Sequence, residues 1–252
     1  MTPEQSHGRA HGMAHPQAAS HPHPHAHGHA HRGHAPARVI ALFGGTFDPV
    51  HSGHIAVAQA AQRRFHLDAI YFVPSSRPPH KSRQSLAPFP HRYAMVALAC
   101  ADHPNFIPSL AEAPSDGSAS HVFYSIDTVK RFRKEHPNDH LYFIVGADQF
   151  LEIPTWHHYE QLLDSCDFII AHRPGFRLDA LRLVVPPEKL GRSRSHDAHA
   201  IELRKTRLHL LSTVTSHVSS TEVRERLAKH QSVRGLVPAR VEEYIRGQAL
   251  YR

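Results

Sequence analysis

Short apolar runs alternate along the chain with longer segments in which apolar residues recur at helical spacing. A near-continuous apolar run of about six residues is typical of a strand that is buried on both faces of a sheet. Apolar residues three and four positions apart predict amphipathic helices instead. This pattern predicts strands at 38–43, 69–74, 105–110, 141–146, 167–174 and 207–212, and helices at 52–65, 90–102, 122–135, 159–163, 219–229 and 238–246.

The alternation of strands and helices indicates a parallel sheet that is covered by helices on both faces. We therefore predict an α/β fold with a Rossmann-like, doubly wound and mostly parallel sheet. Such sheets bind ligands beyond the carboxyl ends of their strands, where the strand order reverses. The segment 176–205 is rich in charged residues, Pro and Ser, and is predicted to be irregular.

The first 36 residues have a different composition from the rest of the chain. They consist mainly of Ala, Gly, Pro, Gln and His, with almost no large apolar side chain. Such a segment cannot bury enough surface to offset the entropy of ordering it, so we predict a disordered extension at 1–36 and one folded domain at 37–252. Histidine occupies every second position from His21 to His31. Deprotonated imidazoles at this spacing could chelate divalent transition metals; the alternative is a neutral extension with incidental metal affinity.

The charge balance and the apolar runs limit the partners of the chain. There are 29 Lys and Arg against 22 Asp and Glu, which favours anionic partners such as nucleotides, nucleic acid or acidic lipid. Basic clusters with interleaved aromatic residues are missing, so nucleic acid is not expected. No apolar run approaches the roughly 18–20 residues that span a bilayer, and no secretion signal is present, so we predict a cytoplasmic protein without membrane contact. Cys100 and Cys166 lie in apolar stretches and are expected to be buried thiols, and the sequence leaves a homo-oligomer open.

The first predicted strand leads into the string GGTFDPVHSGH at residues 44–54. Its two glycines allow the backbone to approach a ligand closely and to adopt positive φ. His51 and His54 are three positions apart near the start of a helix, so both can face the same way, towards the N–H groups and positive dipole end that attract anions. These features favour a polyphosphate site. A purely structural turn and a two-histidine metal pair are the alternatives, although no third metal ligand stands out nearby.

The string GGTFDPVHSGH resembles the signature of the HxGH-containing nucleotidyltransferases, and in particular that of bacterial nicotinate-nucleotide adenylyltransferases. Further segments are similar to motifs of that family and follow in the same order. They are PPHK (78–81), FYSIDT (123–128), FIVGADQF (143–150), IPTW (153–156), HRPG (172–175) and VSSTEVRERL (218–227). The similarity extends over about 38–252 and is weakest at 176–205, and Ser125 stands where the family usually has Thr.

The resemblance implies adenylyl transfer from ATP to nicotinate mononucleotide, which yields deamido-NAD and pyrophosphate in NAD biosynthesis. Mg²⁺ would bridge the phosphates of ATP, so no protein ligand to a metal is expected. One alternative is a related enzyme that uses nicotinamide mononucleotide or pantetheine phosphate as acceptor, or that uses CTP. A second alternative is a metal-handling protein that acts through its histidine-rich extension.

Four residues are implied as catalytic groups that contact phosphates: His51, His54, Lys81 and Arg224. The two histidines would donate hydrogen bonds to phosphate oxygens, although one of them could serve only to fix the turn. Lys81 follows a stiff Pro-Pro segment, and its alternative is a solvated lysine in a loop. Arg224 would bind the β- and γ-phosphates of ATP.

The residues implied to bind substrate are Gly44, Gly45, Thr46, Phe47, Ser125, Gly146, Asp148, Trp156, His157, Arg173, Ser219, Ser220 and Thr221. Asp148 would accept hydrogen bonds from a ribose, with a helix N-cap as its alternative. Trp156 would stack on the pyridine ring, with core packing as its alternative. The hydroxyl of Ser125 and the backbone N–H of His157 would contact the nicotinate carboxylate. A Ser/Thr helix start is also a good N-cap, so the alternative for Ser220 or Thr221 is an N-cap without further function.

Overall fold

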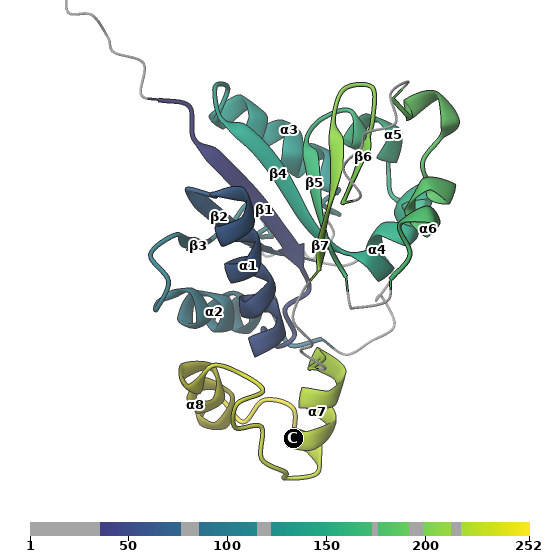
Figure 1. Cartoon of the computed structure of the whole chain (residues 1–252). Helices are drawn as coiled ribbons and strands as arrows, with labels where there is room; N and C mark the ends of the chain where they lie inside the picture. Colours follow the sequence, from purple (N-terminus) through teal and green to yellow (C-terminus); the bar gives the residue numbers. More distant parts are fainter. Residues whose placement is uncertain (1–35, 77–85, 115–121, 173–175, 192–198, 213–217) are drawn as a thin grey trace, which may run out of the picture. The chain divides into compact units, whose positions relative to one another are not determined.

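The computed structural model describes residues 36–76, 86–114, 122–172, 176–191, 199–212 and 218–252, and Figure 1 shows how their helices and strands are arranged. These residues belong to one compact unit, Pro36–Arg252. The expectations for Lys81, for Arg173 and for the extension up to residue 35 lie outside the described residues.

Seven strands form a single sheet in the order β3-β2-β1-β4-β5-β7-β6. Neighbouring strands are parallel except for β6 and β7, which are antiparallel. The chain builds outward on one side from β1 to β3 and on the other side from β4, so the strand order reverses between β1 and β4. The strands are β1 (Val39–Gly45), β2 (Ala69–Pro74), β3 (Phe106–Pro108), β4 (His140–Gly146), β5 (Asp167–His172), β6 (Ala200–Glu202) and β7 (Arg207–Ser212).

Every predicted strand and helix is found, with ends that differ by a few residues, and the predicted α/β class is confirmed. The prediction of an irregular segment at 176–205 is wrong, because α6, a 3₁₀ turn and β6 occupy much of it. The helices are α1 (Ser52–Phe65), α2 (Phe89–Cys100), α3 (Ser125–Glu135), α4 (Ala147–Leu151), α5 (Tyr159–Leu163), α6 (Leu178–Val184), α7 (Ser220–Ala228) and α8 (Ala239–Gly247), with 3₁₀ turns at η2 (Ile153–Thr155) and η3 (Pro187–Lys189).

Successive residues of β1 face opposite sides of the sheet and join two separate apolar cores. Ile40 and Leu42 belong to the core that includes side chains of α3, α4, α5 and α6. Ala41 and Phe43 belong to the core that includes side chains of α1, α2, α7 and α8. This alternation is the period of two that a strand imposes. Both faces of the sheet are therefore buried, as the continuous apolar runs predict.

Cys100 and Cys166 are both buried and free, as the sequence predicts. Burial raises the pKa of the Cys100 thiol to about 12 and also raises the pKa of the Cys166 thiol. Both side chains thus act as small apolar groups of the core.

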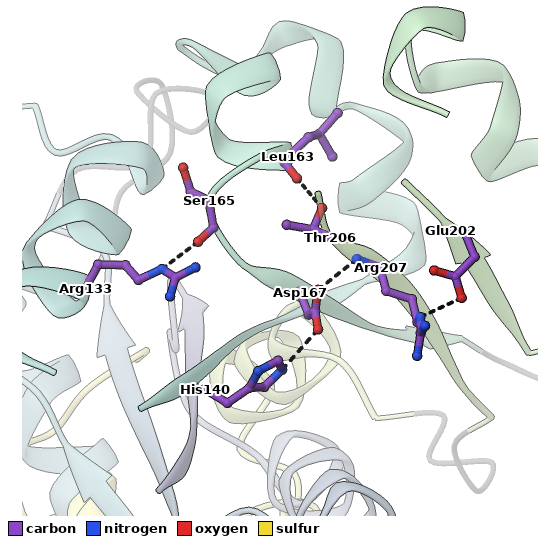
Figure 2. Close-up of polar contacts among 8 residues, drawn as sticks. All are labelled: Arg133, His140, Leu163, Ser165, Asp167, Glu202, Thr206 and Arg207. Carbon is purple, nitrogen blue, oxygen red and sulfur yellow. Dashed lines mark hydrogen bonds and ion pairs between the residues drawn. The ribbon is translucent and has the colours of Figure 1, made fainter. Parts of the chain in front are cut away.

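Polar contacts around Asp167 connect neighbouring strands at the amino ends of β4, β5 and β7 (Figure 2). The Asp167 carboxylate lies 3.0 Å from Nε2 of His140 and accepts a hydrogen bond of 2.8 Å from the backbone N–H of Arg207. The Arg207 side chain in turn lies 2.7 Å from Glu202 on β6. Burial alone would raise the pKa of Asp167, but the contacts from His140 and Arg207 outweigh it and hold that pKa below its usual value. These contacts connect four strands at the end of the sheet that lies opposite to the carboxyl ends of the parallel strands, where ligands are expected.

Candidate active site

β1 ends at Gly45, and residues 46–51 turn the chain towards α1. Neither Gly44 nor Gly45 adopts a positive φ, so that part of the sequence prediction is wrong; Phe47 adopts it instead, with φ of 49°. Gly45 is required for space, because a Cβ there would lie 3.0 Å from the ring of Phe47. Phe47 itself is 1% exposed and packs in the apolar core. Its side chain supports the turn and is not exposed for contact with a substrate.

The two histidines of the turn form a stacked pair at the start of α1. Their ring centroids are 3.7 Å apart, and the backbone N–H of His51 donates a 3.1 Å hydrogen bond to Nδ1 of His54. His51 is 8% exposed, and its own Nδ1 has no hydrogen-bond partner among the described residues. Burial lowers the pKa of His51 from 6.5 to about 4, so its imidazole is neutral at pH 7. A buried polar atom without a partner is costly, and a bound ligand would satisfy it.

Arg92 on α2 holds the same turn in place through hydrogen bonds to the backbone. Its guanidinium is 1% exposed and donates to four backbone carbonyl oxygens. The acceptors are Thr46 and Ser75 at 2.8 Å, Ala87 at 2.9 Å and Ser76 at 3.0 Å. Arg92 thereby joins the turn after β1 to the segment after β2. Sequence reasoning missed this residue, because no local pattern distinguishes a buried arginine from one on the solvent face of an amphipathic helix.

The start of α7 meets the turn from the other side. The Oγ of Ser219 accepts a hydrogen bond of 3.1 Å from the N–H of Glu222, so Ser219 is the N-cap. Ser220 donates from its Oγ to the carbonyl oxygen of Pro49 at 2.9 Å. The alternative that Ser220 or Thr221 is the N-cap is therefore wrong, because Ser219 is the cap and Ser220 positions the helix N-terminus beside the turn.

Asp48 is the point at which three distant parts of the chain meet. Arg224 donates to its carbonyl oxygen at 2.7 Å and to Oγ1 of Thr221 at 3.3 Å. The hydroxyl of Tyr251, at the C-terminus, donates to Oδ1 of Asp48 at 2.6 Å. The same Oδ1 accepts from the N–H of Ala87 at 3.3 Å, and the Asp48 side chain is almost completely buried. Asp48 and Tyr251 were not among the predicted site residues, although Asp48 lies within the motif.

A cavity of about 550 Å³ opens beside the carboxyl ends of β1 and β4, where the strand order reverses. The ring of Trp156 lies edge-on to Phe143, with centroids 6.2 Å apart, so this side chain both packs on the core and faces the cavity. His157 is exposed and its ring stacks on Tyr124 at 4.1 Å. The predicted residues that line this cavity are Gly44, Gly45, Thr46, Ser125, Trp156 and His157.

The remaining predictions around this cavity have mixed outcomes. Gly146 is the N-cap of α4, so the capping alternative for Asp148 is wrong; Asp148 is exposed in the first turn of that helix. Neither residue is among the described residues that line the cavity. The wall also contains polar side chains that sequence reasoning missed, which are Ser75, Glu112, Tyr124, Thr128, Gln149, Glu152 and Thr155.

Residues 42–226 match the cytidylyltransferase-like family. A probable nicotinate-nucleotide adenylyltransferase of Moorella thermoacetica is 42% identical to this chain, over 86% of this chain and 93% of its own length. The chain belongs to the nicotinate-nucleotide adenylyltransferase family. A second family member, from Pelobacter propionicus, is 38% identical over 84% of this chain and 97% of its own.

Solved structures share the fold of this family member at lower identity. Nicotinic acid mononucleotide adenylyltransferase of Plasmodium falciparum, solved in complex with NaAD, has a TM-score of 0.64 at 22% identity and covers 85% of this chain and 97% of its own. A structure from Vibrio parahaemolyticus has a TM-score of 0.57 at 16% identity, covering 85% of this chain and 96% of its own. Among the described residues, no helix is long and apolar enough to cross a membrane.

Proposed function

We propose that the chain transfers the adenylyl group of ATP to nicotinate mononucleotide and so forms deamido-NAD and pyrophosphate. An oxygen of the mononucleotide phosphate attacks the α-phosphorus of ATP, a new P–O bond forms, and the bond to the β-phosphate breaks as pyrophosphate leaves. The attacking group is already an anion, so no covalent intermediate with the enzyme is required. Catalysis then depends on positioning and on stabilising negative charge.

The observation that carries the proposal is the continuity between the histidine turn and the cavity. The turn begins at Thr46, which lines the cavity, and it ends at His51, the N-cap of α1. ATP phosphates on the turn would thus lie next to an acceptor held in the cavity. Neutral His51 and the neighbouring His54 would donate hydrogen bonds to phosphate oxygens, and Arg224 would add a positive charge. The names of the relatives support this assignment.

The cavity wall suits a pyridine mononucleotide. The ring of Trp156 offers a stacking surface for the pyridine. The hydroxyl of Ser125, in the first turn of α3, and the backbone N–H of His157 would donate to the carboxylate of the ring. Asp148, exposed beyond the end of β4, would accept hydrogen bonds from a ribose.

Further groups complete the proposed site. Lys81 and Arg173 would add positive charge near the phosphates. Mg²⁺ keeps much of its water shell and binds phosphates readily, so it would accompany ATP and neutralise part of its charge. The described residues contain no group of three or more His, Cys, Asp or Glu side chains that could hold a metal ion.

Release of pyrophosphate from ATP and Mg²⁺ by the full-length chain tests the proposal, with nicotinate mononucleotide, nicotinamide mononucleotide and pantetheine phosphate as separate acceptors. We expect nicotinate mononucleotide to be the best acceptor. His54→Ala should lower kcat by about 100-fold or more, because it removes a donor to the charge that develops in the transition state. His66→Asn, at the far end of α1, is the matched control and should leave kcat unchanged. Preference for another acceptor would support the alternative of a related enzyme, and full activity of His54→Ala would contradict the role of the turn.

The histidine-rich extension supports a second, separate proposal. Its alternating histidines would bind divalent transition metals while the imidazoles are deprotonated. Calorimetric titration of Ni²⁺ into the full chain, and into a chain that starts at residue 37, measures this binding, and equal affinity of the two would contradict it. We also propose that the chain can form a homo-oligomer. Sedimentation of the same two samples measures the number of subunits.

A further inference from the structure

Glu112 is a buried carboxyl group in the wall of the cavity that we assign to the pyridine. It lies on the segment after β3, is 9% exposed, and lines the cavity together with Ser125 and Trp156. The hydroxyl of Thr128 on α3 donates to Oε1 of Glu112 at 2.8 Å. This contact leaves Oε2 as the oxygen that can carry a proton. The proposed mechanism so far gives Glu112 no role.

The surroundings of Glu112 do not supply a compensating positive charge within the described residues. No Lys, Arg or His forms an ion pair with its carboxyl there. Burial raises the pKa of Glu112 to about 7, and the hydrogen bond from Thr128 partly opposes this rise. The carboxyl therefore changes its charge close to neutral pH, inside a site for an anionic substrate.

We propose that Glu112 determines the preference between a carboxylate and a carboxamide on the pyridine ring. With a proton on Oε2, Glu112 donates a hydrogen bond to the carboxylate of nicotinate mononucleotide. Without this proton, it repels that carboxylate and accepts a hydrogen bond from the NH₂ of a carboxamide. The inference rests on the proposed function, and it adds a pH-dependent choice of acceptor to it.

Other titratable groups face the same space and have to be separated from Glu112. The segment after α4 contributes Glu152 and His157, both exposed at the cavity. From α3, Arg131 donates to the carbonyl oxygen of Ala111 at 3.2 Å and forms an ion pair with Glu135. Tyr124 precedes α3 and also lines the cavity, while the described lining residues of β1, β2 and β4 carry no titratable side chain.

The test is the ratio of kcat/KM for nicotinate mononucleotide to kcat/KM for nicotinamide mononucleotide, measured from pH 6 to pH 8. Both acceptors carry the same phosphate and react with the same ATP, so titrations that affect both equally cancel in the ratio. For the wild-type chain we expect the ratio to fall by about tenfold as pH rises, which corresponds to one pKa unit of coupling between two carboxylates. Glu112→Gln should give a high ratio that is independent of pH, because its NH₂ donates at every pH.

Thr128→Val is a second variant that does not depend on replacing the carboxyl. Loss of the hydroxyl removes the contact that favours the ionised form of Glu112. The midpoint of the pH dependence should therefore move to higher pH, whereas Thr128→Ser should restore it. Glu152→Gln and His157→Gln are the matched controls in the same cavity, and both should retain the wild-type pH dependence of the ratio.

Binding gives an independent measurement of the same proton. Calorimetry at pH 7 in buffers of different ionisation enthalpy should show that nicotinate mononucleotide takes up more protons than nicotinamide mononucleotide on binding, and Glu112→Gln should abolish this difference. An enzyme that adenylylates nicotinate mononucleotide with a pH-independent ratio would overturn the role of Glu112 alone. A pH dependence that disappears in His157→Gln but persists in Glu112→Gln would do the same. A chain that adenylylates neither acceptor at any pH would overturn the proposed function, and with it this inference.

Discussion

In the proposed site, His51 and Arg224 would offer a phosphate two different kinds of contact. His51 is buried and neutral at pH 7, so it provides a directional hydrogen bond without a charge. Arg224 is only half-buried and stays charged, and its contacts to Asp48 and Thr221 fix the direction of its guanidinium. The proposed phosphate site thus combines a buried, uncharged donor with a cation at its rim.

Neutral His51 makes the stability of the protein depend on pH. Its pKa is about 4 in the folded protein and about 6.5 in an unfolded chain, so the unfolded state binds more protons between these values. The stabilisation of the folded state that depends on neutral His51 is fully present above pH 6.5. It is lost as the pH falls towards 4, by about 3 kcal/mol in total. His51→Asn cannot gain this proton, and Asn suits an N-cap. Urea unfolding at several pH values should show a shallower acid dependence for this variant.

His66→Asn serves as the control for this measurement, because it removes an exposed histidine from the same helix. Its acid dependence should match that of the wild-type chain. Equal slopes for wild type and His51→Asn would show that His51 takes up its proton as readily in the folded protein as in the unfolded one.

At the scale of elements, the C-terminal segment after α8 completes the turn that follows β1. Tyr251→Phe removes the hydroxyl that donates to Oδ1 of buried Asp48. The loss should destabilise the fold by about 1–3 kcal/mol and raise the KM for ATP, because Asp48 also positions Arg224 through its carbonyl oxygen. Thermal unfolding and steady-state kinetics measure the two effects.

Tyr244→Phe is the matched control within the same part of the chain. The hydroxyl of Tyr244 lies 2.9 Å from Nδ1 of His91, and among the described residues it forms no hydrogen bond with the turn. This variant should lose a similar amount of stability without any change in the KM for ATP. If both variants altered the kinetics equally, Tyr251 would have no special connection to the phosphate site.

Most of the elements that could be predicted from sequence are long, and the short β3 and α5 are the exceptions. Strands such as β1 and β2 are largely continuous apolar runs, and α1 has its predicted ends, because each carries a full period of its pattern. The five residues of α4, the seven of α6 and the three of β6 are too short to show a period.

The candidate site divides in the same way. The motif marks residues that are close in sequence, including His51 and His54. Arg92, Glu112 and Tyr251 are absent from the prediction because their partners come from other parts of the chain. The Tyr251 hydroxyl, for example, meets a carboxylate 203 positions earlier. No local pattern contains such a contact, and a buried charged residue contradicts the usual hydropathy rule.

At the scale of the whole unit Pro36–Arg252, the candidate site and the contacts of Asp167 lie at opposite ends of the strands. The cavity adjoins the carboxyl ends of β1 and β4, whereas the Asp167 contacts lie at the amino ends of β4, β5 and β7 (Figure 2). The strands that separate these two ends are six or seven residues long. Substitutions at the amino ends of these strands should therefore change the stability of the fold without changing kcat or KM.

Asp167→Asn tests this separation. It removes the charge that faces His140 and should destabilise the fold by about 1–3 kcal/mol at pH 7. Because the pKa of Asp167 is lowered in the folded state, its stabilisation is present above the unfolded pKa of about 3.9 and is lost as the pH falls below it. Thermal unfolding measures the loss, and kcat and KM should stay at wild-type values. An altered kcat or KM in a folded Asp167→Asn protein would show that the Asp167 contacts are coupled to the candidate site.

The contact between Asp48 and Tyr251 also sets an order of events during translation. Asp48 is synthesised 203 residues before its partner, and at about 5–20 residues per second a ribosome needs roughly 10–40 s to cover that interval. The turn thus gains this contact only after α8 has been synthesised, and a nascent chain that has not yet reached Tyr251 carries its sheet strands but lacks a contact of the candidate site.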